Sequence, residues 1–351
     1  MKIDRVHFYT RNAAKTKDWF IRNIGFKAIS NHIDRETHTE VVALNSACLQ
    51  FSSPLTNNSP VAKYLNAHPS GVADITFRVR DIQSIIDRAY RLGLKIVQPL
   101  QTCLSERGRF KQAQIQGWQD LQHTLIEDDN IASEGQTISD RTSNITTVDH
   151  IVLNVAVGKL KDAVKLYQAL FGFKIQQSFN IQTKTSGLYS QALIDDSGEV
   201  QFNINEPTSP NSQIQQFIEL NGGSGIQHLA LRSQNLIEDV AGMQQKEVAF
   251  LDIPSEYYDK LDCNLNLTTE EWQEIAKRQI LVDCDRTSLQ SLLMQIFTQP
   301  IFEQPTFFLE FIERRQQAQG FGRGNFNELF AAVEREQTKV KRADLPNPII
   351  E

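Results

Sequence analysis

Short runs in which apolar and polar residues alternate recur along this chain, and such alternation is typical of β-strands with one buried face. Two examples are IDRVHFYT at residues 3–10 and VDHIVLNV at residues 148–155. After each run, apolar residues recur at helical spacing up to a glycine, Gly25 in IGFKA and Gly172 in FGFKI. Because glycine favours the left-handed backbone just beyond a helix, both helices are predicted to end there.

The two halves of the chain share this plan beyond their first strand and helix. GVADITFRVRDI at 71–82 resembles GIQHLALRSQNL at 225–236, and QHTLIEDD at 122–129 resembles FFLEFIER at 307–314. A strand, a helix and further strands, occurring twice in each half, predict an α+β chain of four related modules.

Composition divides the chain into segments. One stretch between the halves is polar with little periodicity, which indicates a linker. The predicted segments are a first module pair, this linker, a second module pair that ends in a helix, and a tail: residues 1–130, 131–147, 148–340 and 341–351. Within the second pair, residues 254–286 form an insertion that the first pair lacks. There Thr268 and Glu271 have the spacing of a helix N-terminus.

Charge and composition exclude several classes of function. The net charge of -6, without a Lys/Arg-rich stripe, predicts no nucleic-acid partner. No apolar run reaches the ~18 residues of a membrane helix, and the first residues read as a strand instead of a signal segment. No two cysteines form a CxxC pair, which predicts reduced thiols in a cytoplasmic protein: Cys48, Cys103, Cys263 and Cys284.

Two histidines and a glutamate in the second half are candidate metal ligands. Beyond residue 149 the only histidines are His150 and His228, and each lies inside a predicted strand. Glu310 lies in the aromatic and aliphatic run TFFLEFIER, where an unpaired buried carboxylate is costly and a cation is expected. Two imidazoles and one carboxylate on rigid strands can form a facial triad, which holds a metal and leaves positions open for substrate and O2.

The aligned positions of the first half carry Arg5, Asp74 and Thr124. A residue that serves only to pack the core should be similar in both halves. All three candidate ligands are replaced in the first half, which indicates that only the second half binds a metal and carries the active site. The alternative is that these residues have only a structural role. A histidine in a strand is more often a core residue than a ligand, and Arg314 or Arg315 could form an ion pair with Glu310. The joint replacement favours the metal site.

The types of ligand limit the choice of metal ion but do not identify it. This donor set suits Fe(II), Mn(II), Co(II) or Zn(II). Catalytic zinc with two histidines and a glutamate usually occurs with a HExxH helix, and the chain has none.

The second half resembles the 4-hydroxyphenylpyruvate dioxygenase family of the vicinal oxygen chelate superfamily. The matching stretches run in the family's order from roughly residue 148 to 337: VDHIVLNV, SGLYSQAL, VQFNINEP, SQIQQFIELNGGSGIQHLAL, LLMQIFTQP, FFLEFIERR and GFGRGNFNELFAAVEREQ. The first half matches only in length and module plan. The resemblance implies repeated βαβββ modules forming two open-barrel domains, a glyoxalase-like fold in which only the second domain is catalytic.

The resemblance also implies the composition of the site. It places Fe(II) on His150, His228 and Glu310, and the C-terminal helix over the iron as a lid. It gives catalytic roles to Gln295, Gln227 and Asn205. The substrate-binding positions that it implies are Ser190, Asn205, Gln213, Gln295, Phe297, Phe321 and Phe326. One departure is Asn203, which lies near the implied pocket and stands where several relatives have proline.

The implied reaction converts 4-hydroxyphenylpyruvate and O2 to homogentisate and CO2, by oxidative decarboxylation, ring hydroxylation and side-chain migration. The implied assembly is a homodimer or homotetramer. Homogentisate serves tyrosine catabolism or tocopherol and plastoquinone biosynthesis, and the residues do not distinguish these roles.

Three alternatives stay open. One is 4-hydroxymandelate synthase, which oxidises the benzylic carbon of the same substrate; the retained Asn205 favours the dioxygenase. A second is an extradiol ring-cleaving dioxygenase, a family that lacks the GFGxGNF segment. The third is a non-catalytic ligand-binding repeat protein, against which stands the presence of all three ligand residues.

Overall fold

The computed structural model describes residues 1–105, 108–128, 140, 143–182, 186–259, 261, 267–284, 291–316, 318–326, 328–333, 335 and 350. The greater part of the predicted linker and of the predicted tail therefore lies outside the described residues. The segment from 145 to 147, predicted as linker, is strand, because Ile145 pairs with Ser233 in the second sheet.

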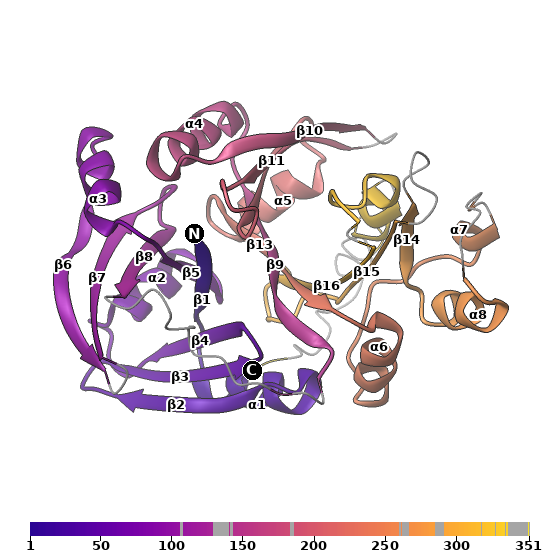
Figure 1. Cartoon of the computed structure of the whole chain (residues 1–351), viewed down its shortest axis with the longest axis horizontal. Coiled ribbons are helices and arrows are strands. Elements are labelled where there is room, and N and C mark those ends of the chain that lie inside the picture. Colours follow the sequence, from indigo (N-terminus) through magenta and orange to yellow (C-terminus); the bar gives the residue numbers. More distant parts are fainter. Residues whose placement is uncertain are drawn as a thin grey trace.

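The first half of the chain forms one eight-stranded sheet with its helices (Figure 1). Its elements are β1 (Lys2–Tyr9), α1 (Ala13–Trp19), the π-helical turn η1 (Phe20–Ile24), β2 (Lys27–Ile33), β3 (Thr37–Leu44), β4 (Ala47–Pro54), α2 (Pro60–Ala67), β5 (Gly71–Arg78), α3 (Ile82–Arg91), β6 (Ile96–Ser105), β7 (Gly108–Gln116) and β8 (Gln122–Asp128).

The second half forms another eight-stranded sheet. Its elements are β9 (Ile145–Asn154), α4 (Leu160–Phe171), β10 (Lys174–Gln182), β11 (Gly187–Ile194), β12 (Gln201–Pro207), α5 (Gln213–Leu220), β13 (Gly225–Ser233), α6 (Leu236–Gln245), α7 (Glu256–Asp259), α8 (Thr269–Lys277), β14 (Leu281–Cys284), β15 (Leu292–Phe297), β16 (Phe308–Arg315) and the 3-10 turn η2 (Arg323–Asn325). Described residues among 326–335 are also helical.

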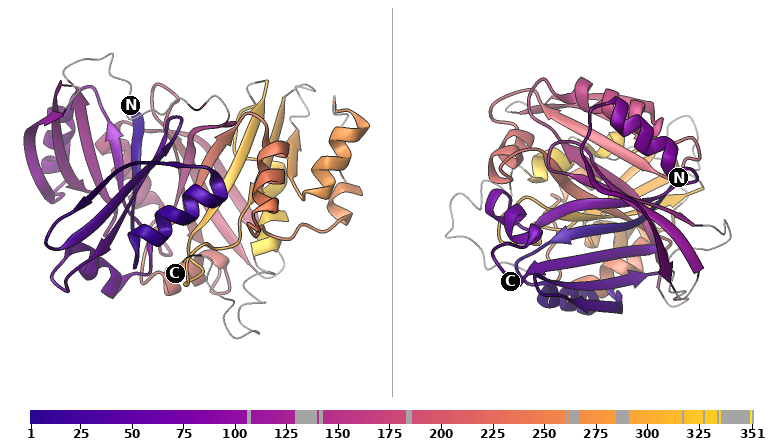
Figure 2. Two further views of the ribbon diagram at one scale, coloured as in Figure 1. Left: turned by 90° about the horizontal axis from the view of Figure 1, so that it is seen from below. Right: turned by 90° about the vertical axis from the view of Figure 1, so that its left-hand side faces the viewer.

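The two sheets have the same topology, β2-β3-β4-β1-β5-β8-β7-β6 and β10-β11-β12-β9-β13-β16-β15-β14. In each, the first strand of a module pairs in parallel with the last, and the two modules meet through an antiparallel pair, β1 with β5 or β9 with β13. The sheets curl into two open barrels that lie side by side along the long axis (Figure 2). The predicted α+β fold of four βαβββ modules in two open barrels is confirmed.

Strand register confirms the alignment between the halves. Arg5 on β1 pairs with Thr76 on β5, and His150 on β9 pairs with Ala230 on β13. Each antiparallel pair also has a register shift at the equivalent place, beside Val72 in one sheet and beside Ile226 in the other. The duplicated fold therefore gives both halves the same set of interior positions.

In the first sheet these positions hold a hydrogen-bonded polar cluster. The buried carboxylate of Asp74 accepts hydrogen bonds from Gln114 Nε2 (3.0 Å), Thr124 Oγ1 (2.9 Å) and Thr76 Oγ1 (3.2 Å). Burial raises the pKa of Asp74 above its usual value, while these donors oppose the rise. Neutral side chains of the same sheet therefore supply the hydrogen bonds that this buried carboxylate needs.

A continuous apolar core joins the two barrels. The connection between β15 and β16 reaches into the first barrel, where Phe307 meets Phe8 edge-on with ring centroids 5.1 Å apart. Helices α3 and α4, one from each barrel, lie next to each other (Figure 1). Between them, Arg88 Nε donates to the carbonyl of Leu170 at 2.8 Å. The first barrel thus supports the second through both apolar and polar contacts.

The insertion contains α7 and α8, beside β14. As predicted, Thr268 caps α8: its hydroxyl accepts the N–H of Glu271 at 3.1 Å. Among the described residues, no helix has the length and apolar character needed to cross a membrane.

Gly172 ends α4 with φ +77°, and its counterpart Gly25 has φ +99°. Gly172→Ala is expected to destabilise the fold by about 1 kcal/mol, because a Cβ is disfavoured in the left-handed region. Gly242→Ala is the matched control, since Gly242 lies inside α6 with open space at its Cβ position. That variant should stabilise by roughly 0.5–1 kcal/mol. Urea unfolding measures both, and equal effects would contradict the assignment of Gly172.

Candidate metal centre and substrate cavity

Three neighbouring central strands bring the candidate ligands together. His150 on β9 pairs with Ala230 on β13, and Ala230 pairs with Glu310 on β16, so these residues form one row across the sheet. His228 lies two residues before Ala230 on the same strand and thus on the same face. The small side chain of Ala230 leaves the space into which the flanking residues converge.

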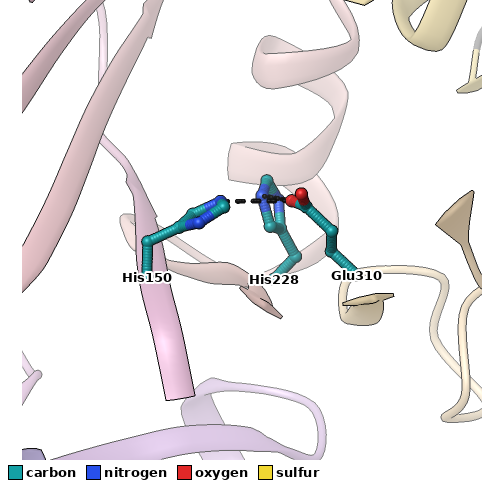
Figure 3. A group of neighbouring side chains, drawn as sticks. All are labelled: His150, His228 and Glu310. Carbon is teal, nitrogen blue, oxygen red and sulfur yellow. Dashed lines mark ion pairs between the residues drawn. The ribbon is translucent and has the colours of Figure 1, made fainter. Parts of the chain in front are cut away.

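The three ligand atoms converge at one point, as Figure 3 shows. Glu310 Oε2 lies 3.1 Å from His150 Nε2 and 3.4 Å from His228 Nε2. One ligand atom from each residue lies within 4.8 Å of the others. The exposed fractions are only 2% for His150, 8% for His228 and 1% for Glu310. A buried group of this composition can hold one metal ion.

Electrostatics of the metal-free site favour a proton where a metal would bind. Burial alone would lower the pKa of His150, but the charges of Glu310 and Asp149 raise it above its usual value. Burial would raise the pKa of Glu310, but His150 and His228 hold it below the usual range. Burial lowers the pKa of His228. The protonated form of His150 therefore faces an ionised Glu310.

Asp149, next to the first ligand, orients its imidazole. The Asp149 carboxylate lies 3.0 Å from His150 Nδ1, which leaves Nε2 facing Glu310. Two guanidinium groups neutralise this fully buried carboxylate: Arg314 donates through Nε and Nη2 at 2.9 and 2.7 Å, and Arg232 through Nε at 2.8 Å. A carboxylate behind a histidine fixes its tautomer and its ring orientation, an arrangement common at metal sites.

Neither Arg314 nor Arg315 forms an ion pair with Glu310, as the alternative interpretation of the sequence would require. The guanidinium of Arg314 lies on Asp149, and that of Arg315 lies on Glu313 and Glu271. The polar neighbours of Glu310 are instead the two histidines and Gln295, whose Nε2 donates to Oε1 at 2.8 Å.

A cavity adjoins the triad, and the residues predicted for the site all line it. Besides the three ligands these are Ser190, Asn203, Asn205, Gln213, Gln227, Gln295, Phe297, Phe321 and Phe326. The register shift between Ile226 and His228 leaves Gln227 without a paired residue on β9, which explains why Gln227 and its neighbour His228 both face the cavity.

Two residues of the site, Phe308 and Asp149, were not predicted from the sequence. Phe308 stacks on His228 with ring centroids 4.8 Å apart and an interplanar angle of 20°. Its place in an alternating strand, two residues before Glu310, was a usable signal. Asp149 could have been found as the residue beside a ligand, but its arginine partners could not.

Gln295 contacts the loop at residues 318–326 as well as the triad. Its Oε1 accepts the Nδ2 group of Asn325 at 2.9 Å, so both ends of the amide are engaged. Gly322, at φ +72°, allows this approach, because a Cβ there would overlap Oε1. In this structure Gln295 therefore holds Glu310 as well as lining the cavity.

Comparison with known proteins accounts for this arrangement. The family model of the glyoxalase/bleomycin resistance protein/dioxygenase superfamily matches residues 2–128 and 147–261. A 4-hydroxyphenylpyruvate dioxygenase of Dictyostelium discoideum is 32% identical, over 95% of this chain and 97% of that protein. This chain belongs to the 4-hydroxyphenylpyruvate dioxygenase family. An uncharacterized Synechocystis protein is also 33% identical, over 99% of this chain and 100% of its own length.

Solved structures agree with this family membership. A triple mutant of 4-hydroxymandelate synthase from Streptomyces coelicolor superposes with a TM-score of 0.83 at 25% identity, covering 96% of this chain and 98% of that chain. In this member of the dioxygenase family, the second barrel carries the cavity and the candidate ligands, and the first barrel carries the Asp74 cluster at the equivalent positions.

A divalent cation must displace the proton held between His150 and Glu310. Binding of Co(II) is therefore expected to release about one proton, and the affinity should rise with pH because fewer protons compete. Calorimetric titration in two buffers of different ionisation enthalpy measures the release. In Glu310→Gln the pKa of His150 falls, so less proton release and weaker binding are expected. An unchanged proton count and affinity in that variant would contradict this electrostatic description.

Proposed function

We propose that this chain is an Fe(II)-dependent dioxygenase that converts 4-hydroxyphenylpyruvate and O2 to homogentisate and CO2. The observation that carries the proposal is the buried His150, His228 and Glu310 group, at the wall of a cavity otherwise lined by neutral side chains. The names of the relatives that align over nearly the whole chain support it.

The donor set fits Fe(II). Two imidazoles and one carboxylate on one face leave the opposite face open, which is the arrangement of non-haem Fe(II) oxygenases. Bound Fe(II) would supply the positions that hold a 2-oxo acid and O2, together with the redox chemistry. The protein itself binds, orients and shields the substrate.

The chemistry of the cavity wall fits an aromatic 2-oxo acid. Among the described residues that line it there is no lysine or arginine, so the metal is the counter-charge for a substrate carboxylate. Phe297, Phe308, Phe321 and Phe326 offer apolar surface to an aromatic ring and exclude water.

Polar atoms without partners favour a phenol. Gln213 Oε1 and Asn203 Oδ1 are buried and have no hydrogen-bond partner among the described residues. Each can accept a hydrogen bond from a phenolic hydroxyl without adding charge. We assign substrate binding to these amides with Ser190 and Asn205, and orientation of the reacting groups to Asn205, Gln227 and Gln295.

4-Hydroxymandelate synthase is the second candidate, because that enzyme has nearly the same fold over the whole chain. The two activities share substrate and donor set, and they differ in the carbon that is oxidised. Asn205, which favours the dioxygenase, lies in the cavity wall. We further propose a cytoplasmic homodimer or homotetramer whose first barrel supplies the subunit contacts.

Product identity tests the proposal. Protein reconstituted anaerobically with Fe(II) and then given 4-hydroxyphenylpyruvate and O2 should yield homogentisate, identified by chromatography against standards because hydroxymandelate is its isomer. Glu310→Ala should lose iron and turnover while keeping its fold by circular dichroism. Hydroxymandelate as product would establish the synthase, and full activity of Glu310→Ala would refute the triad.

Gln213→Leu should lower kcat/KM roughly fivefold, the effect of about 1 kcal/mol for one hydrogen bond. Gln215→Leu, on the same helix α5 but outside the cavity lining, is the matched control. Substrate lacking the phenolic hydroxyl should show no difference between wild type and Gln213→Leu. Equal kinetics of both variants with the natural substrate would remove Gln213 from the binding site.

A further inference from the structure

The loop at residues 318–326 lies directly against the candidate metal centre. The ring of Phe321 meets the ring of His150 edge-on, with centroids 5.3 Å apart. The ring of Phe326 meets Phe179 on β10 in the same way, with centroids 4.9 Å apart. The loop therefore forms a wall of the cavity and contacts a candidate ligand through its apolar side chains.

One chain of hydrogen bonds runs from the insertion through this loop to Glu310. The Tyr257 hydroxyl lies 2.8 Å from Asn325 Oδ1 and 3.0 Å from the carbonyl oxygen of Val282, and it accepts the N–H of Val282 at 2.8 Å. Asn325 Nδ2 donates to Gln295 Oε1 at 2.9 Å. Gln295 Nε2 then donates to Glu310 Oε1 at 2.8 Å. Gln295 and Asn325 are both buried, so water is kept from replacing the hydrogen bond between them. Gln295 Nε2 also lies 3.3 Å from the carbonyl oxygen of Phe321 in the loop.

A second chain runs from the other end of the loop to His150. Arg314 Nη1 donates to the carbonyl oxygen of Gly320 at 2.7 Å. The same guanidinium holds Asp149 through two hydrogen bonds, and Asp149 holds His150 Nδ1. The side chains of Arg314 and Asp149 are 8% and 0% exposed, so water cannot replace these bonds while the loop is closed.

We propose that the loop at 318–326 and the metal ligands form one hydrogen-bonded unit, in which closure of the loop and orientation of His150 and Glu310 are energetically coupled. Tyr257, which does not line the cavity, acts in this unit as a positioning residue. The inference rests on the proposed function, because it concerns the metal centre assigned there.

The coupling follows from the burial of each link. An opened loop takes Asn325 and the Phe321 carbonyl away from Gln295. It also takes the carbonyls of Ala318 and Gly320 away from Arg314. Both side chains are then free to change the contacts that they give to Glu310 and Asp149. Linkage is reciprocal, so a bound metal must shift the equilibrium between open and closed loop toward the closed form by the same factor by which closure strengthens metal binding. Loss of a group that directly supports a ligand costs 10–100-fold in affinity. A smaller effect, roughly three- to tenfold, is expected for Tyr257, two side chains further away.

The test compares Tyr257→Phe with Tyr258→Phe in the full-length protein. The Tyr258 hydroxyl donates to the backbone carbonyl of Ile280 and has no contact with the loop. Two readouts are independent of turnover: the Co(II) dissociation constant from its visible absorption, and amide hydrogen exchange at residues 318–326 with and without Co(II). Tyr257→Phe should weaken Co(II) binding roughly three- to tenfold and speed loop exchange by a similar factor.

A second pair of variants tests the hydrogen bonds that run from Gly320 through Arg314 and Asp149 to His150. Arg314→Lys and Arg232→Lys each remove one guanidinium from Asp149, but only Arg314 reaches the carbonyl of Gly320. Arg314→Lys should therefore change both Co(II) affinity and loop exchange. Arg232→Lys should leave the loop exchange as in wild type.

Each outcome decides the proposal. Joint changes in Tyr257→Phe that are missing in Tyr258→Phe support the coupling. Faster loop exchange with unchanged Co(II) affinity, weaker affinity with an unchanged loop, no change in either, or equal changes in both tyrosine variants would overturn it. Failure of the wild-type protein to bind Co(II) is a separate result, which would refute the metal centre of the proposed function.

Discussion

A carboxylate buried at the centre of a sheet is unstable unless positive charge or hydrogen-bond donors surround it. Two such carboxylates, Glu310 and Asp149, determine the arrangement of charged groups in the second barrel. Glu310 faces the imidazoles of His150 and His228, and Asp149 faces two guanidinium groups. Because Asp149 also contacts His150, acidic and basic groups alternate through the interior. A divalent cation between Glu310 and the histidines would complete this alternation. The metal centre, its supporting arginines and the loop held by Arg314 all follow from the need to neutralise buried charge.

The first barrel meets the same constraint by hydrogen bonding instead of metal binding. At the position equivalent to His228 it buries Asp74, whose carboxylate accepts bonds from two threonines and a glutamine. Thr76 occupies the position of Ala230, so the space left open between ligands in one barrel carries a hydroxyl donor in the other. The same duplicated fold therefore holds a fully hydrogen-bonded polar cluster in the first barrel and a candidate ion site in the second.

The sequence sufficed to predict the four modules, because alternation of apolar residues and glycine-terminated helices repeat visibly in both halves. It also sufficed for the triad, because Arg5, Asp74 and Thr124 break the repeat where the ligands stand. Ser190 and Gln213 could be proposed only through a resemblance, since a buried polar residue looks like any other in one sequence. The contact between Asp149 and Arg314 escaped prediction, because residues 165 positions apart meet only through the strand order. The start of β9 escaped it as well, since pairing with β13 extends the strand into a polar segment.

The most direct test of this account is a crystal structure of the Co(II)-loaded protein, with anomalous scattering measured at the cobalt edge. We expect a single strong peak within coordination distance of Nε2 of His150, Nε2 of His228 and the carboxylate of Glu310, with Asp149 still hydrogen-bonded to Nδ1 of His150. A peak elsewhere, or none in protein that binds the ion in solution, would contradict it.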